Sequence, residues 1–380
     1  MVPGPASCVP VGPKTATGSN PKARGIRPGA RAGHGVYARR MSTPTVNRRI
    51  LLASRPHGEP AATDFQHDET TVPSPGPGQV LLRTLYLSLD PYVRGRMSAA
   101  RSYAAPMEVG DVIVGGTVSE VVESATVDFS PGEVVLSYGG WQEYSLEPAE
   151  GLRRLDPEVA PVSTALGVLG MPGFTAYAGL LEIGRPQPGE TVAVAAATGP
   201  VGSAVGQIAK AKGARTIGIA GGPRKVEHLR ELGFDEAIDH REPALAERLE
   251  EAAPGGIDVY FENVGGPVWD AVLPQLNEFA RVPVCGLAAN YNATELPEGP
   301  DRTGQLMASV LAKSLTLRGF IQREFAQTHF EDFLADMSAW VRSGEVRYRE
   351  DITEGLDRAP ETFVGMLRGD NFGKTLIKVS

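Results

Sequence analysis

The sequence predicts an α/β protein of two domains, in which an irregular β-barrel precedes a doubly wound parallel sheet. Three observations lead to this prediction. The 380 residues suffice for two domains of ordinary size. Short strand-like runs separated by Gly and Pro turns occupy residues 41–165. Beyond residue 166, strand-like and helix-like runs alternate, which is the rhythm of a parallel sheet with helices on both faces.

Composition limits the class of protein before any motif is considered. Hydrophobic residues make up 42% of the chain, but no run of about 18 apolar residues occurs, so no membrane span is expected. The two cysteines, Cys8 and Cys285, are too few for a disulfide framework or a four-cysteine zinc site. This cysteine usage favours a reducing, cytoplasmic setting.

The first forty residues are expected to be disordered, because they are rich in Gly, Pro and Arg and lack apolar periodicity. Residues 1–40 carry seven Lys and Arg and no acid, so a net charge of −8 leaves −15 on residues 41–380. An acidic body gives no reason to expect a nucleic-acid partner. Translation from Met41 would leave the segment outside the native protein; a transit peptide and a basic nucleic-acid-binding arm are the alternatives.

The first domain is predicted from five short strands, at 49–54, 80–89, 111–122, 132–137 and 141–145. Asp90 and Pro91 end the second of them, and Tyr92, Arg94 and Arg96 follow on a loop or short helix. This segment either contributes to a site or is a turn whose arginines pair with the acidic surface.

The glycine-rich turn near residue 200 carries the clearest chemical signal. A buried strand is expected at 192–197 and a helix at 201–212, with Gly199, Gly202 and Gly206 opening the second segment. In dinucleotide-binding turns, separate glycines allow the tight turn, the approach of backbone N–H groups to a phosphate, and close helix–strand packing. The helix N-terminus adds partial positive charge for a pyrophosphate. An ordinary strand–turn–helix is the alternative.

The strands that follow favour the dinucleotide. They are expected at 216–220, 257–261, 280–286 and 315–321, with a helix at 223–232 after the first. Sheets of this kind bind ligands at the C-terminal ends of their strands. The residues expected at those ends are Gly199, Gly222, Asn263, Gly286 and Phe320.

The end of the second strand of this sheet indicates which dinucleotide binds. NAD-binding proteins usually place an acidic residue there, whereas this chain offers Gly221, Gly222, Pro223, Arg224 and Lys225. No carboxylate is present to repel a 2′-phosphate, and two cations could pair with it. The alternative is that Arg224 and Lys225 are only solvated residues at the start of a helix. Cations are mildly unfavourable at a helix N-terminus unless an anion binds there, so the pair favours NADP(H) binding.

The C-terminal part is predicted to contain amphipathic helices at 330–341 and 356–367 and a last strand at 375–379 that returns to the first domain. The nucleotide-binding domain is therefore expected to span 166–334. The β-barrel domain is expected to comprise 41–165 together with 335–380.

At this point the chain resembles a family, the zinc-independent medium-chain dehydrogenase/reductases. Within it, residues 41–380 are most similar to the prostaglandin reductase and 2-alkenal reductase branch, which includes bacterial NADPH-dependent curcumin reductases. The motifs that carry the resemblance are LASRP (52–56), LSLDPY (87–92), GMPGFTAY (170–177), AATGPVG (196–202), ENVGG (262–266), YNAT (291–294) and GDNFGK (369–374).

The resemblance implies a GroES-like domain and a Rossmann domain with NADPH in the cleft between them. His240 stands where many relatives have a tyrosine near the adenosine phosphate. The implied cofactor-binding residues, together with those expected above, are Met171, Thr175, Thr198, Gly199, Pro200, Val201, Gly202, Gly222, Arg224, Lys225, His240, Asn263, Cys285, Gly286, Leu287, Tyr291, Phe320, Ile321, Gln322 and Asn371.

The implied reaction is NADPH-dependent reduction of the C=C bond of α,β-unsaturated aldehydes and ketones. Tyr291 and Tyr92 are the candidate hydrogen-bond donors to the developing enolate, because Asp90 replaces the catalytic cysteine of zinc-dependent relatives and no metal is expected. A quinone reductase and a non-catalytic NADPH-binding protein are the alternatives. Relatives suggest a homodimer, and the physiological substrate cannot be read from the sequence.

Overall fold

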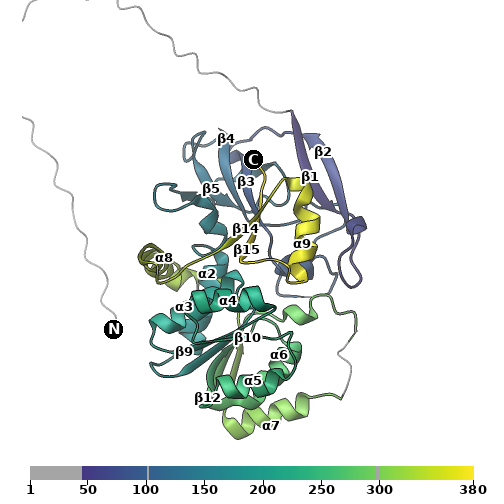
Figure 1. Ribbon diagram of the computed structural model, residues 1–380. Coiled ribbons are helices and arrows are strands. Elements are labelled where there is room, and N and C mark those ends of the chain that lie inside the picture. Colours follow the sequence, from purple (N-terminus) through teal and green to yellow (C-terminus); the bar gives the residue numbers. More distant parts are fainter. Residues whose placement is uncertain (1–44, 101, 296–299) are drawn as a thin grey trace, which may run out of the picture. The chain divides into compact units, whose positions relative to one another are not determined.

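The computed structural model describes residues 45–100, 102–295 and 300–380, so the predictions for 1–40 concern a segment outside the described residues. Two halves are visible in Figure 1, one built on antiparallel strands and one on a parallel sheet with helices around it. The predicted α/β class, with a β domain and a doubly wound sheet, is confirmed.

The β half consists of a hairpin and a seven-stranded sheet. The hairpin pairs β1 (Val46–Leu52) with β2 (Phe65–Thr71). The larger sheet has the order β14-β15-β3-β4-β5-β7, with β6 also on β3. Its strands are β3 (Gln79–Ser88), β4 (Thr117–Ser124), β5 (Val134–Ser137), β6 (Tyr144–Pro148), β7 (Arg153–Leu155), β14 (Glu350–Glu354) and β15 (Lys374–Lys378).

The last strand returns to the first half, as predicted: β15 pairs antiparallel with β3, with Leu376 opposite Ser88. An aromatic cluster seals the core beside it. Phe65 stacks on Trp141 at 5.9 Å between ring centroids, and Phe363 of α9 (Ala359–Leu367) meets the edge of Trp141 at 5.6 Å. Residues from the two ends of the chain therefore share one core.

The strand predicted at 111–122 is only half right, since β4 begins at Thr117. A Cβ on Gly115 would lie 2.9 Å from the Leu87 side chain, so this part of the chain presses its backbone against β3. The β2, β7 and β14 strands were not predicted. They are rich in polar and charged residues, and β2 (FQHDETT) shows no apolar alternation to signal a strand.

The parallel sheet has the order β10-β9-β8-β11-β12-β13. The strand order reverses between β8 and β11: β9 and β10 are added on one side of β8, and β11, β12 and β13 on the other. Its strands are β8 (Thr191–Ala195), β9 (Arg215–Ala220), β10 (Glu236–Asp239), β11 (Ile257–Phe261), β12 (Leu276–Val284) and β13 (Thr316–Gly319). The predicted strands of this sheet are all present; β10 was missed because its four residues, EAID, begin and end with an acid and form no apolar run.

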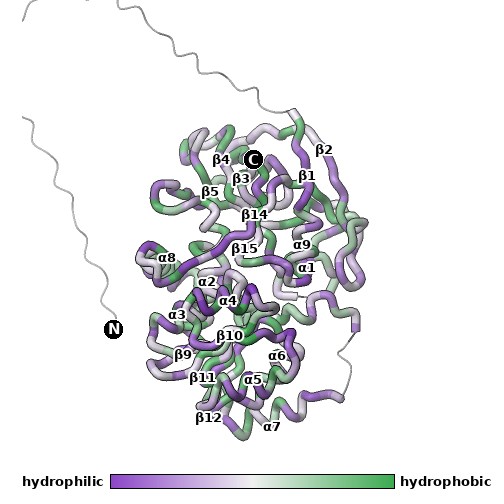
Figure 2. The backbone as a smooth tube through the Cα atoms, viewed as in Figure 1, coloured by the Kyte–Doolittle hydropathy of each residue, from purple (hydrophilic) through white to green (hydrophobic). Residues whose placement is uncertain are grey.

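Helices cover both faces of this sheet (Figure 1). They are α3 (Pro200–Ala211) and α4 (Pro223–Glu231) on one side and α5 (Leu245–Ala252), α6 (Gly266–Val272) and α7 (Thr303–Lys313) on the other. Successive residues of β8 point to opposite cores, Val192 and Val194 to one and Ala193 and Ala195 to the other. In Figure 2, α4 and α5 alternate purple and green, as expected for helices with one buried face.

β12 begins four residues before the strand predicted at 280, since it runs from Leu276. Phe279 interrupts its pairing, with a φ of 63° and 68% of its surface exposed. An exposed aromatic residue in a left-handed conformation is a bulge that sequence periodicity does not reveal.

The helix predicted at 330–341 is longer, α8 (Ala326–Ser343), and Phe333 and Met337 bury its inner face in the core beside α2 (Met171–Ala178). The domain boundary proposed at residue 335 falls within this helix.

Candidate active site

The glycine turn between β8 and α3 is shaped by close contacts. Gly199 precedes the helix, and a Cβ on Gly202 would lie 2.5 Å from the carbonyl oxygen of Ala196. A Cβ on Gly206 would lie 2.0 Å from the ring of Phe234, so this glycine lets α3 rest on that ring. No side chain caps α3 in the described structure. Its first-turn N–H groups are therefore suited to bind an anion such as a pyrophosphate.

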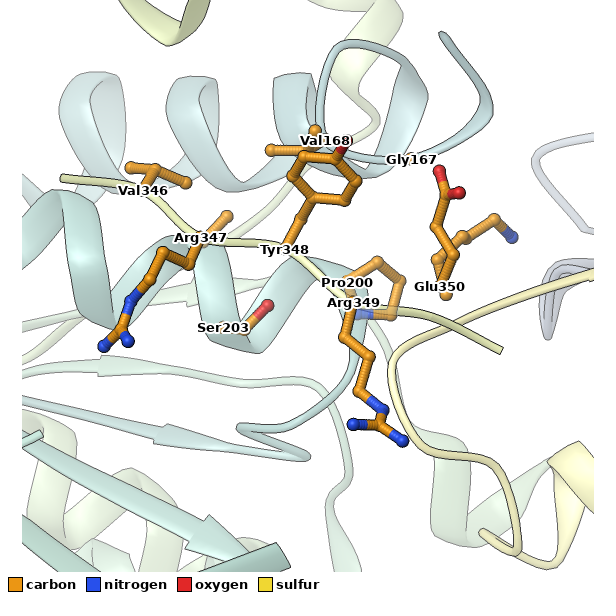
Figure 3. Close-up of a pocket in the computed structure, with 11 residues that line it drawn as sticks. Gly167, Val168, Pro200, Ser203, Val346, Arg347, Tyr348, Arg349 and Glu350 are labelled. Carbon is orange, nitrogen blue, oxygen red and sulfur yellow. The ribbon is translucent and has the colours of Figure 1, made fainter. Parts of the chain in front are cut away.

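The segment 346–350 runs along the first turns of α3, beside Pro200 and Ser203 (Figure 3). The hollow between them measures about 10 Å³, which is room for one water molecule and not for a ligand. Thr198 is buried and Val201 is half-buried at the same turn. This face of the turn is packed, so a cofactor would have to approach from the strand ends.

Cations gather where β9 and β10 end, as an NADP(H) site requires. Lys225 donates a hydrogen bond to the carbonyl oxygen of Gly369 at 2.7 Å. A Cβ on Gly221 would lie 2.7 Å from Arg241 Nε and 2.8 Å from His240 Nε2, so these two side chains lie against that backbone. Burial and the charge of Arg241 lower the pKa of the Lys225 ammonium. Excess positive charge of this kind would be relieved by a bound phosphate.

Arg241 was missed in the sequence, although a cation directly after His240 was a readable signal. Arg224 lines a hollow with His228, Arg349 and Phe372. The backbone of Gly222 is held by Asp239, whose Oδ1 accepts its N–H at 2.9 Å. The Asp239 carboxylate is thus occupied with the backbone of this turn.

The ends of β11 and β12 are tied to the central strand. Asn263 Nδ2 donates to the carbonyl oxygen of Ala195 at 3.0 Å, and Glu262 Oε1 accepts the N–H groups of Val264 and Gly265 at 2.6 and 2.8 Å. Burial raises the pKa of the Glu262 carboxyl, with the backbone donors opposing that shift. Sequence reasoning missed this role of Glu262, which holds the turn at the point where the strand order reverses.

The segment after β12 brings Tyr291 back over the strand ends. A Cβ on Gly286 would lie 2.9 Å from Tyr291 Oη, so glycine at 286 leaves room for the hydroxyl. Burial, followed by the neighbouring Cys285 and Tyr103, raises the pKa of Tyr291 to about 12. Burial also raises the pKa of the Cys285 thiol to about 12. The Tyr291 hydroxyl and the Cys285 thiol are therefore both neutral near pH 7. Leu287, on the same loop, is 42% exposed.

Tyr92 approaches from the other half of the molecule. It is the first residue of α1 (Tyr92–Arg96), and burial followed by the charge of Asp90 raises its pKa well above the ordinary value. Tyr138 and Tyr103 lie near enough to add to that shift, and Tyr103 also adds to the shift of Tyr291. Tyr103 therefore acts on both candidate tyrosines and Tyr138 acts on one of them, and the sequence indicated neither Tyr103 nor Tyr138.

Asp90, expected to replace a zinc-binding cysteine, forms a buried ion pair. Its Oδ1 lies 2.8 Å from Lys374 Nζ, and Ser88 Oγ donates to its Oδ2. The ammonium also donates to the carbonyl oxygen of Leu89 at 2.8 Å. Within residues 45–100, 102–295 and 300–380, no group of three or more His, Cys, Asp or Glu side chains could hold a metal ion.

The other predicted cofactor contacts occupy several elements. Thr175 Oγ1 donates to the carbonyl oxygen of Met171 within α2 at 2.8 Å. Phe320 is buried against Phe261, with centroids 6.1 Å apart, and Ile321 and Gln322 follow it. Asn371 Nδ2 donates to the carbonyl oxygen of Gly373 at 3.0 Å. Their predicted cofactor contacts remain proposals.

Comparison with known proteins places this geometry in a family. Residues 48–155 match the family model described as the N-terminal domain of oxidoreductase, and residues 200–339 match that described as zinc-binding dehydrogenase. The NADPH-dependent curcumin reductase of Escherichia coli is 56% identical over 335 residues, covering 88% of this chain and 97% of that protein. Prostaglandin reductase 1 of Rattus norvegicus is 42% identical over 325 residues, covering 84% of this chain and 95% of that protein.

A solved structure agrees with these relatives. The crystal structure of CurA in complex with NADPH from Vibrio vulnificus superimposes with a TM-score of 0.86 at 52% identity, covering 88% of this chain and 99% of that one. The chain belongs to the medium-chain dehydrogenase/reductase family, in the zinc-independent branch that includes the curcumin and prostaglandin reductases.

Proposed function

We propose that this protein reduces the C=C bond of α,β-unsaturated aldehydes and ketones with NADPH. The observation that carries the proposal is the hydrogen bond from Arg94 to Asn292 at 3.0 Å, which joins the β half to the nucleotide half. Tyr92 lies two residues before that arginine and Tyr291 directly precedes that asparagine, and the raised pKa of each phenol keeps its hydroxyl neutral. Such an arrangement provides hydrogen-bond donors for a developing oxyanion. The likeness to curcumin and prostaglandin reductases supports the same chemistry.

The residues present fit NADPH. Gly202 lets α3 pack closely on the backbone of the β8–α3 turn, and the uncapped first-turn N–H groups of α3 suit a pyrophosphate. Lys225 and Arg241 would supply the charge for a 2′-phosphate, with Arg224 as a further cation at the start of α4. Burial and the charge of Arg241 lower the pKa of His240, so its imidazole would add an uncharged hydrogen-bonding group beside them. Asn263 and Gly286 would lie toward the nicotinamide end, at the reversal of strand order.

When bound, NADPH supplies the hydride for the β-carbon of the substrate. The protein must then stabilise the negative charge that grows on the carbonyl oxygen. Because the pKa of Tyr291 is raised to about 12, its hydroxyl keeps its proton and can donate a hydrogen bond to that oxygen. Tyr92 is the second donor. A proton must also reach the α-carbon, and either hydroxyl or solvent could deliver it.

Two further tyrosines, Tyr103 and Tyr138, favour a flat, conjugated substrate. Tyr103 and Tyr138 are 54% and 67% exposed, and both act on the pKa of Tyr92. Planar aromatic walls pack well against conjugated or aromatic substrates. Arg323 Nη2 donates to the carbonyl oxygen of Tyr103 at 3.4 Å and helps hold this loop in place.

The test is to follow NADPH absorbance with a panel of enals, enones, quinones and diarylheptanoids. Enones and enals should be the best substrates; faster turnover of quinones would favour a quinone reductase, and tight NADPH binding without turnover would favour a non-catalytic protein. Tyr291→Phe should lower kcat by roughly 10² to 10³, the cost of one oxyanion donor. Tyr86→Phe, on β3, is the matched control. Unchanged kcat and KM in Tyr291→Phe would refute the donor role.

We also propose a homodimer in the cytoplasm. β13 is the last strand of the parallel sheet, so its outer edge has no strand partner among the described residues. On α7, Met307 and Leu311 are 59% and 83% exposed, which provides apolar surface for a second copy. Light scattering with Leu311→Glu tests the dimer, and a wild-type monomer would refute it.

No described helix is long and apolar enough to cross a membrane.

A further inference from the structure

Arg94 connects the two halves of the molecule at the edge of the site. Its Nε donates to Asn292 Oδ1 at 3.0 Å, and its Nη2 donates to the carbonyl oxygens of Gly58 and Pro56 at 2.7 and 3.4 Å. Arg94 and both carbonyls belong to the β half, whereas Asn292 belongs to the loop that follows β12. The arginine was expected either to serve a site or to pair with acidic surface groups. Its contacts exclude the surface pairing, because the side chain is only 5% exposed.

The partners of this guanidinium are unusual for a buried charge. They are an amide oxygen and backbone carbonyls rather than a carboxylate. Asp64 is the acidic group whose charge acts on Arg94, but its own oxygens accept hydrogen bonds from Ser54 Oγ and the Ala61 N–H. Burying a cation without an ion-pair partner costs folding free energy. Such an arrangement is more readily explained by a positional role than by stability.

The contact is flanked by the two candidate donors. Tyr92 lies two residues before Arg94 in α1, and Tyr291 directly precedes Asn292. A second contact supports the same junction, since a Cβ on Gly58 would lie 3.7 Å from Thr294 Cγ2. One hydrogen bond thus links the short segments that carry the two tyrosines. A shift of either segment would change the separation of the two hydroxyls.

We propose that Arg94 is a positioning residue, whose hydrogen bond to Asn292 sets Tyr92 and Tyr291 at their working separation across the site. The inference rests on the proposed function for its effect on catalysis, although the bridge itself can be tested without it. Neither residue needs to touch substrate or cofactor. Their effect reaches the reaction through the geometry of the donors, to which rates are highly sensitive.

The test compares variants that break and restore the bridge. Asn292→Ala and Arg94→Lys should each lower kcat for an enone by about tenfold to a hundredfold, with the dissociation constant for NADPH unchanged. Asn292→Asp should restore kcat, since a carboxylate also accepts the Arg94 Nε–H. The double variant Arg94→Lys/Asn292→Ala should be no slower than the worse single variant, because both remove one interaction.

Arg55→Lys is the matched control. Arg55 donates to the carbonyl oxygen of Met97 at 3.3 Å and pairs with Glu108 at 3.0 Å, both within the β half, so kcat should not change. Wild-type kcat in Asn292→Ala, or losses that multiply in the double variant, would overturn the proposal.

A second measurement does not depend on activity. Hydrogen exchange of amides 288–295 should be faster in Asn292→Ala than in wild type, and not in Arg55→Lys, because the bridge anchors this loop. Faster exchange with no enone reduction by the wild-type protein would refute the proposed function and retain the bridge. Unchanged exchange in Asn292→Ala would refute the bridge whatever the wild-type activity.

Discussion

Replacing Lys374 by methionine should destabilise the protein strongly, because it leaves the Asp90 carboxylate buried without its partner. The side chains of Lys374 and Asp90 are only 3% and 7% exposed, and their charged atoms lie 2.8 Å apart. At an effective dielectric constant of about 20, that separation corresponds to an attraction of about 6 kcal/mol. Desolvation of two ions offsets much of it, so the pair as a whole adds little stability. Removing one partner keeps most of the penalty and loses the attraction.

The expected loss in free energy of unfolding for Lys374→Met is therefore about 3–5 kcal/mol, measured by urea denaturation. Asp90→Asn should lose a similar amount, and the double variant should recover much of the loss. Lys378→Met is the matched control on the same strand, since the Lys378–Glu354 pair is 44% and 79% exposed; it should lose less than about 1 kcal/mol. Equal small losses in both methionine variants, or a double variant as unstable as the singles, would refute the reasoning.

Three further outcomes are expected. Lys225→Met should weaken NADPH binding roughly tenfold to a hundredfold, but not NADH binding, in fluorescence titrations; equal losses would contradict a 2′-phosphate contact. Gly206→Val should cost about 1–3 kcal/mol in urea denaturation, because its Cβ would meet the Phe234 ring, and no loss would show that α3 can move. Because the pKa of Tyr291 is raised to about 12, its hydroxyl stays protonated to higher pH, so kcat/KM should show no tyrosine limb between about pH 6 and 9. A limb in that range that Tyr291→Phe abolishes would contradict this protonation state.

Much of the nucleotide half was predictable because its signals are local. The apolar runs at β8, β9 and β11 are buried on both faces of the sheet and appear as continuous hydrophobic segments. Gly202 and Gly206 stand where backbone and ring approach closely, so glycine itself marks those contacts. The β half was harder, since β2 and β14 contain many charged residues and are defined by pairing with distant strands.

The sequence by itself determined the fold class, and it indicated the glycine-rich turn and the two tyrosines of the proposed site, because each depends on residue type and short spacing. Only the tertiary structure decided which side chains act together. It brought Arg241 close to Lys225. It also joined Arg94 to Asn292 across 198 positions of sequence. Contacts over such distances are set by how sheets and loops pack, and no local pattern in the chain encodes them.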